Sequence, residues 1–259
     1  MSRIASRPTP GMAALRRDDR GVAMTEFALV LPLLLLVGLV GAEVANFAIA
    51  NLRVSQIAMT TADNAGRVRD AISEYDVNEL FIGAKLMGEG IKFAEHGRII
   101  LSSIEPRTDA PKTTSVNTGS GTVEMPNQWI RWQRCYGMKQ ASSSYGMPRN
   151  AAGTAITDGK EVDGSTTKTD QVKSVPTNGA SNTPTGMGPP SNQIGAGSGT
   201  AVMFVEVVYD YQPIIATSFL GNRTIRYTSA FNVRQRNDQV MKLAGLDTNK
   251  RPTCNRFYS

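Results

Sequence analysis

Histidine is almost absent from this chain: His96 is the only one among 259 residues, and there are only two cysteines. Zinc sites use sets of His, Cys and carboxylate ligands, so a single His excludes a His-based metal cage. Its position before Gly97 favours a capping or solvated role at a helix end. The patterns Gly-x-Ser-x-Gly, Gly-x-x-x-x-Gly-Lys and Gly-x-Gly-x-x-Gly are also missing. We therefore expect no enzyme, no cofactor and no small-molecule substrate.

Calcium loops and nucleic-acid surfaces are not indicated either. Asp158, Glu161 and Asp163 are spaced differently from the Asp-x-Asp-x-Asp-Gly ligands of a calcium loop. The net charge is +6, part of which comes from arginines near the N-terminus. A nucleic-acid-binding protein is expected to show a clustered basic face with aromatic residues between the charges. The sequence has no such cluster, so nucleic acid is not an expected partner.

One long apolar run near the N-terminus is the most informative feature that is present. No charged residue occurs between Phe27 and Ala42, and the apolar character extends to about Ala50. A helix of about 20 residues spans the hydrocarbon core of a bilayer. We therefore predict a transmembrane helix over residues 22–50. Pro32 lies inside this segment and is expected to kink or loosen the helix, because it lacks an N–H group.

The charges before this run predict its orientation. The chain before Glu26 contains two aspartates and five arginines. The arginines are Arg3, Arg7, Arg16, Arg17 and Arg20. Lys and Arg residues next to a transmembrane helix tend to stay in the cytoplasm, whereas acids contribute little to this bias. The short N-terminal leader is thus expected in the cytoplasm and the long C-terminal part on the other side of the membrane.

Two simpler interpretations of the apolar run stay open. It is a cleaved secretion signal if a signal peptidase cuts near Val40-Gly41-Ala42 or Ala48-Ile49-Ala50, where small residues occur. The run is longer than a usual signal core of about 7–15 residues, which weighs against this interpretation. Alternatively, it is a plain signal anchor in which the Glu26 carboxylate has no role.

The residues around the start of the run carry a specific resemblance. The stretch Arg-Gly-Val-Ala-Met-Thr-Glu-Phe-Ala-Leu-Val-Leu-Pro at 20–32 places Gly21 five residues before Glu26, and the apolar helix follows at once. This arrangement is similar to the processing site of type IV prepilins. More narrowly, it resembles the TadE/TadG-like pseudopilins of the tight-adherence (Flp) pilus machinery. The likeness covers about thirty residues and is weak over the rest of the chain.

That resemblance implies a processing step and a set of partners. A prepilin peptidase is expected to cut after Gly21, so that residues 1–21 are a leader peptide and Val22 becomes the new N-terminus. Glu26 then stands at mature position five, and Phe27 and Pro32 belong to the same assembly motif. The implied partners are other pilin or pseudopilin subunits and the peptidase, in the bacterial inner membrane, with a periplasmic head. The Asp-x-Ser-x-Ser motif of adhesion domains in some TadG-like relatives is not found.

A free amine at Val22 also suggests a physical role for Glu26. A carboxylate in lipid is unfavourable unless it has a partner. An amine of one subunit that pairs with Glu26 of its neighbour offsets two buried charges and sets the axial register of the helices.

The two cysteines predict a covalent link within the exported part. Cys135 and Cys254 allow one intramolecular pairing, and exported proteins with an even number of cysteines usually form disulfides. We expect a bridge between them that ties the C-terminal tail to the middle of the head. Two unrelated free thiols are the alternative.

Residues 51–97 are predicted to be helical. Apolar residues continue at steps of three and four, which marks one face of a helix: Val54, Ile57, Ala58, Thr61, Ala62, Ala65, Val68 and Ile72. We expect the membrane helix to run on as a spine, although a separate amphipathic helix would show the same pattern. Asp76 and Glu79 resemble a capping box that begins a second helix, which frays near Gly88 and Gly90.

Residues 98–259 are predicted to form an α+β head with an antiparallel sheet. Strands are expected at 98–104, 129–136, 201–211 and 222–236, and in the last two the large residues occupy alternate positions that face one way. Residues 106–128 are expected to be a loop. Residues 151–200 contain almost no large apolar side chain, so we predict a flexible surface insertion.

Together these features predict a minor pseudopilin-like structural component of a tight-adherence pilus, with the domains 1–21, 22–50, 51–97 and 98–259. The alternative is a membrane-anchored or released periplasmic binding protein whose polar insertion recognises another envelope component.

Overall fold

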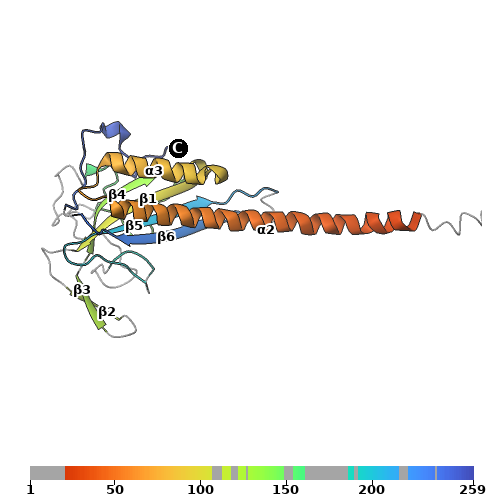
Figure 1. The fold of residues 1–259 in the computed structure, drawn as a ribbon, viewed down its shortest axis with the longest axis horizontal. Coiled ribbons are helices and arrows are strands. Elements are labelled where there is room, and N and C mark those ends of the chain that lie inside the picture. Colours follow the sequence, from red (N-terminus) through yellow and green to blue (C-terminus); the bar gives the residue numbers. More distant parts are fainter. Residues whose placement is uncertain are drawn as a thin grey trace, which may run out of the picture. The chain divides into compact units, whose positions relative to one another are not determined.

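The computed structural model describes residues 21–106, 113–117, 122–126, 128–148, 154–160, 186–189, 192–215, 221–236 and 238–259. The chain divides after Phe47 into two compact units, Met1–Phe47 and Ala48–Ser259. The first contains the apolar part of a long helix. The second, which we call the head, combines helices with antiparallel strands, so the predicted α+β class is confirmed (Figure 1).

The long helix α2 runs without interruption over Val22–Arg67, which is 46 residues. The prediction that the apolar segment continues as one helix is therefore confirmed. The helix is not interrupted at Pro32. The last turn of α2 contacts Arg236, whose Nη2 donates to the Ala65 carbonyl at 2.7 Å. This side chain satisfies a carbonyl that has no partner within the helix and places a positive charge at the negative end of the helix dipole.

The main sheet of the head has four strands in the order β4-β1-β5-β6, all antiparallel. They are β1 (Gly97–Pro106), β4 (Gln128–Tyr136), β5 (Val202–Asp210) and β6 (Thr224–Asn232). The four predicted strands are thus confirmed, with ends that differ by a few residues. The register between β1 and β4 shifts at Ser103/Ile104, where Arg131 is left without an opposite residue.

Helices cover one face of this sheet. The head part of α2 turns small and branched residues toward it, all of them fully buried: Val54, Ile57, Ala58, Ala62 and Ala65. Helix α3 (Glu74–Gly88) adds Phe81, which stacks on Tyr136 of β4 with ring centroids 5.8 Å apart. A short turn η2 (Glu89–Ile91) and helix α4 (Phe93–His96) then place Phe93 against Tyr209 of β5.

Irregular segments cover the other face. A core cluster joins Ile104, Ile130, Val202 and Phe204 of the strands to Met187 and Ala196. Strands β1 and β5 are consequently buried along nearly their whole length on both sides. The alternating pattern of β5 predicted large residues that face one way, and the structure adds that the other face is buried as well, because a second layer of chain covers it.

Part of the segment predicted as a surface insertion therefore belongs to the core. Met187 and Ala196 are almost fully buried, and Met187 pairs with Ile194 in an isolated antiparallel bridge. The Gln128 side chain fixes this segment by exchanging two hydrogen bonds with the backbone of Ala196, at 2.8 and 3.1 Å. Residues 161–185 of the predicted insertion lie outside the described residues.

Two local predictions are wrong. The capping box of α3 uses Ser73 and Asp76 rather than Asp76 and Glu79: the Asp76 carboxylate accepts from the Ser73 N–H at 2.7 Å, and the Ser73 hydroxyl accepts in return. Ser is the better N-cap here because its short side chain reaches the N–H of the third helical residue.

Residues 106–128 are not all loop, since β2 (Thr113–Asn117) and β3 (Thr122–Pro126) pair as a separate two-stranded sheet.

The C-terminal segment is fastened along β4, which is an edge strand of the sheet. Cys135 and Cys254 form a disulfide, and the Cys135 N–H donates to the Pro252 carbonyl at 2.8 Å. The Gly137 N–H donates to Tyr258, farther along the tail. A short turn, η5 (Thr248–Lys250), precedes this segment. The structure therefore contains the expected bridge, and the tail covers an edge that would otherwise expose unpaired backbone groups.

Candidate functional site

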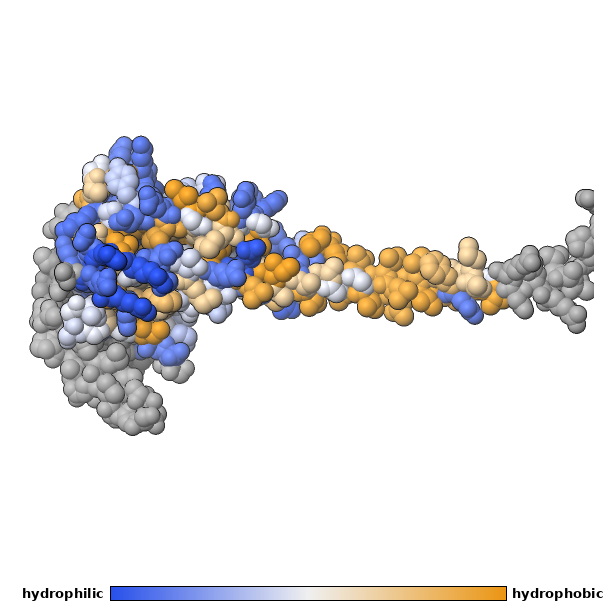
Figure 2. Space-filling model, viewed as in Figure 1, coloured by the Kyte–Doolittle hydropathy of each residue, from blue (hydrophilic) through white to orange (hydrophobic). Residues whose placement is uncertain are grey.

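The strongest candidate site is the first part of α2, in the N-terminal unit. Gly21 lies directly before the helix and Val22 is its first residue. From here to Phe47 nearly every side chain is exposed, and the exposed residues are mostly large and apolar. Figure 2 shows this section of α2 as an almost continuous apolar surface. A surface of this kind is unfavourable in water and marks a membrane or protein contact.

By its length and composition, α2 is one helix that is apolar enough to cross a membrane. The central part contains the exposed run Leu33-Leu34-Leu35-Leu36-Val37. A helix that is hydrophobic on all sides has no polar face to turn toward water, unlike an amphipathic helix of a globular protein. The composition of α2 thus fits a bilayer or a bundle of similar helices.

Glu26 is the charged exception within this apolar surface. It is exposed, and it follows Val22 by about one helical turn, so the two residues lie on the same side of α2. Between them the Thr25 hydroxyl donates to the Val22 carbonyl at 2.8 Å, which keeps this polar side chain satisfied within the helix. Phe27 and Pro32 are also on the exposed surface of the first turns. The structure thus places the predicted residues of the N-terminal motif together on one helix.

The disulfide belongs to the head and does not take part in this constellation. Its sulfur atoms join the end of β4 to the tail, beside Arg98 of β1. Arg98 is fully buried and donates to the carbonyls of Gly137, Cys254 and Arg256 at 2.7–2.8 Å. Burial lowers the pKa of the Arg98 guanidinium to about 10, which still leaves it charged at neutral pH. We interpret this arrangement as structural, since the guanidinium donates to three backbone carbonyls and lies over the Phe257 ring, with Cζ 4.3 Å from the ring centroid.

A second buried charge lies on the helical face of the sheet. Arg134 of β4 and Glu74 in the first turn of α3 are both fully buried, with the closest N–O distance at 2.5 Å. The sequence patterns did not identify Arg98, Arg134 or Glu74, because burial of a charged residue depends on distant segments. Apart from the Gln133 carbonyl next to Arg134, the partners named for these residues lie between 39 and 158 residues away in the chain.

His96 has the position that its sequence context indicated. It is the last residue of α4, and its Nε2 lies 3.8 Å from the neighbouring Glu95 carboxylate. Within the parts of the chain that the structure describes, no three His, Cys, Asp or Glu side chains are placed so that they could hold a metal ion.

Comparison with known proteins agrees with the N-terminal motif. A family model described as TadE-like protein matches residues 21–63, which begin at Gly21 and include most of α2. This region is therefore TadE-like, and it associates the chain with components of the Tad pilus. No curated protein and no solved structure matches the chain. The head beyond the match thus has to be interpreted from its own geometry.

Proposed function

We propose, from the TadE-like character of residues 21–63, that this protein is a minor pseudopilin of a tight-adherence pilus system. The leader, residues 1–21, stays in the cytoplasm and a prepilin peptidase removes it. Helix α2 holds the protein in the inner membrane over about residues 22–50, and the head lies in the periplasm. The protein acts as a structural subunit that assembles with other pilin-like subunits and catalyses no reaction.

One observation carries this proposal: the family match begins at Gly21, helix α2 begins at Val22, and the first part of this helix is an exposed apolar surface. A cut after Gly21 releases an N-terminus that is already the first residue of α2. The new α-amine stands at the positive end of the helix dipole, where a positive charge is unfavourable. A nearby carboxylate relieves this, and Glu26 is the first one in α2.

Glu26 has two ways to meet the amine of Val22. Within one subunit the two groups are about one turn apart on the same side of the helix. Between subunits, a neighbour that is shifted along the helix axis brings its amine to the same carboxylate. We propose the second arrangement as the assembled state, because it joins two chains and sets their register, and because an unpaired charge in lipid is strongly disfavoured.

The processing step is tested first, by intact mass and N-terminal sequencing of the protein extracted from membranes. We expect Val22 as the N-terminus. A Gly21→Leu variant should retain its leader, since a bulky side chain does not fit a peptidase subsite that accepts glycine. An N-terminus at Met1, or one near Glu43 or Asn51, contradicts the proposal. The last two would indicate a secretion signal peptide instead.

The role of Glu26 is tested by Glu26→Gln, which keeps the shape of the side chain and removes its charge. Removal of one partner from a buried ion pair costs about 3–5 kcal/mol. The variant should insert and be processed normally but fail to cross-link to other pilin-like subunits. A plain anchor predicts the opposite, because loss of a charge improves insertion. Wild-type cross-linking of Glu26→Gln would support the anchor or the binding-protein alternative.

A further inference from the structure

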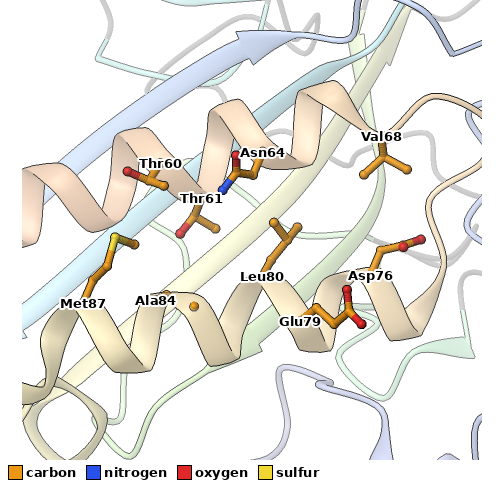
Figure 3. A pocket seen from close by; sticks show the side chains of 10 residues that line it. Thr60, Thr61, Asn64, Val68, Asp76, Glu79, Leu80, Ala84 and Met87 are labelled. Atoms are coloured by element: carbon orange, nitrogen blue, oxygen red, sulfur yellow. The ribbon is translucent and has the colours of Figure 1, made fainter.

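Helices α2 and α3 of the head enclose an open groove of about 390 Å³. Its lining is mixed: apolar and polar side chains both occur along it, and the two carboxylates, Asp76 and Glu79, lie toward the end where α3 begins (Figure 3). The apolar residues include Val68, Leu80, Ala84 and Met87, and the polar ones are Thr60, Thr61, Asn64, Asp76 and Glu79. Such a groove suits a side chain with an apolar stem and a polar end, as lysine and arginine have.

The groove has unused hydrogen-bonding capacity along its length. Thr61 is 2% exposed, and its hydroxyl has no hydrogen-bond partner among the described residues, although a buried hydroxyl without a partner is unfavourable. The Asp76 carboxylate uses Oδ2 for its cap on Ser73. Glu79 is exposed and forms no ion pair with another described residue. The two carboxylates at the α3 start, Asp76 and Glu79, form a site for a cation with several N–H donors, and the Thr61 hydroxyl offers a further unsatisfied group in the same groove.

A guanidinium has the donors that this site lacks. It presents five N–H groups in a planar fork and forms bidentate bonds with carboxylates. With its head near Asp76 and Glu79, its methylene stem would lie over Leu80 and Ala84. An ammonium group fits less well, because it is a compact point charge.

The matching cations lie on the opposite flank of α2, beside β6. A pocket of about 240 Å³ there is lined by Gly66, Arg67, Arg69, Arg234 and Gln235. Arg67 is held by Asp63 at 2.7 Å, whereas Arg69 and Arg234 are exposed and form no ion pair or hydrogen bond with another described residue. Arg236 already places a positive charge at the C-terminal end of α2. Arg69 and Arg234 are therefore available for another partner.

The two sites lie at the same level along α2. Val68 and Asp76 line one end of the groove together, in Figure 3 as well, and Gly66 and Arg67 belong to the turn of α2 just before Val68. The basic pocket is on the β6 side, since a side chain at Gly66 would meet the Asn232 carbonyl oxygen at 3.3 Å. Two heads that lie side by side in the same orientation therefore place the basic flank of one beside the acidic flank of the next.

We propose that the heads of two copies of this chain pack side by side, with Arg69 and Arg234 of one copy on the groove at Asp76 and Glu79 of the other. This inference rests on the proposed function, which supplies the common orientation of the copies. The contact uses different surfaces of the two copies, so it repeats from one subunit to the next and suits a row or a filament rather than a closed pair.

The experiment uses two differently tagged full-length copies co-expressed in membranes. The first copy carries the photoreactive residue p-benzoylphenylalanine in place of Gln235, which lines the basic pocket. We expect cross-links to peptides of α3 in the second copy, identified by mass spectrometry. Arg69→Glu with Arg234→Glu in the first copy should lower the yield about ten-fold or more, because like charges facing each other are strongly unfavourable.

Rescue in trans makes the test specific. Glu79→Arg in the second copy should restore the cross-link to the charge-reversed first copy, and this cannot result from repaired folding of the first copy. Lys250→Glu in the first copy and Glu89→Lys in the second are matched controls, since both residues are exposed charges outside the two sites. Both controls should leave the yield unchanged.

Three results would overturn the inference: cross-links that persist after charge reversal, no rescue by Glu79→Arg, or cross-links that map to another protein. A second probe at Leu33 reports contacts between the apolar helices. If helix cross-links form and head cross-links do not, the head contact is wrong while the proposed function stands. If neither forms in the wild type, the proposed function and the inference both fail.

Discussion

Glu74→Gln is the most informative single test of the head, because it leaves the shape of a fully buried ion pair intact and removes one charge. The Arg134 Nε lies 3.0 and 2.9 Å from the two oxygens of the Glu74 carboxylate, and Nη2 lies 2.5 Å from Oε1. The other terminal nitrogen, Nη1, donates to the Gln133 carbonyl at 2.8 Å. After the change, the guanidinium keeps that carbonyl and one amide oxygen but has no anion.

The expected loss of stability follows from the burial of both partners. A solvent-exposed ion pair contributes about 0–1 kcal/mol, because water and salt screen it. Both side chains of this pair are 0% exposed, so no water replaces the lost carboxylate. Breaking a buried pair by removing one partner costs about 3–5 kcal/mol. We expect Glu74→Gln to lower the free energy of unfolding by this amount, and Glu74→Leu with Arg134→Met to cost much less, because that double variant removes both charges.

The chain provides its own probe for this measurement. Its two tryptophans, Trp129 and Trp132, are both buried in β4, the strand that carries Arg134. Urea unfolding of the detergent-solubilised full-length protein, followed by tryptophan fluorescence, therefore reports on the sheet. A loss below about 1 kcal/mol for Glu74→Gln would refute the reasoning, since it would mean that the pair behaves like an exposed one. Equal losses in the single and double variants would refute it as well.

Three further outcomes are expected in the same unfolding assay. Reduction of the disulfide at Cys135 should destabilise the head by about 2–5 kcal/mol, and no change would contradict a structural role for the bridge. Gly88→Ala should destabilise because its methyl group would overlap with the Phe93 side chain, whereas Gly83→Ala in the same helix meets open space and should stabilise by about 0.5–1 kcal/mol. Burial raises the pKa of Tyr209 from 10.0 to about 12. The protonated side chain therefore stabilises the head below pH 10, and this contribution should disappear as the pH rises toward 12. Tyr209→Phe should reduce that alkaline loss, and an unchanged pH profile would contradict the assignment.

Local patterns were sufficient to predict the helices and the main strands. The apolar spacing from Val54 to Ala65 describes the face of α2 that is buried in the head, whereas Val68 and Ile72 lie beyond the end of the helix at Arg67. The alternating strand patterns locate β4, β5 and β6. These signals are strong because side-chain periodicity directly reflects one buried face of a regular element. The hairpin β2–β3 was missed because its strands are only five residues long and lie in a polar segment.

Long-range contacts account for what the local patterns missed. The alternation in β5 indicates one buried face, yet chain segments around Met187 and Ala196 cover the other one. The role of Gly66 is visible only in the structure, where the lack of a side chain lets α2 approach the backbone of Asn232. Asn232 lies 166 positions after Gly66, and Met187 lies 83 positions after Ile104 of the same core cluster, so no local pattern reports these contacts.

The sequence alone determined the apolar helix, its motif at Gly21 and Glu26, and the choice of the only two cysteines as a pair, because each depends on composition or on neighbours in the chain. Only the tertiary structure decided which charges are buried and which are available. Arg98 and Arg134 are held inside the head, whereas Arg69 and Arg234 are exposed and line a pocket on the flank of α2 opposite the groove that contains Asp76 and Glu79. All four are arginines with the same intrinsic chemistry, and the difference between them is set by the elements that pack around each one.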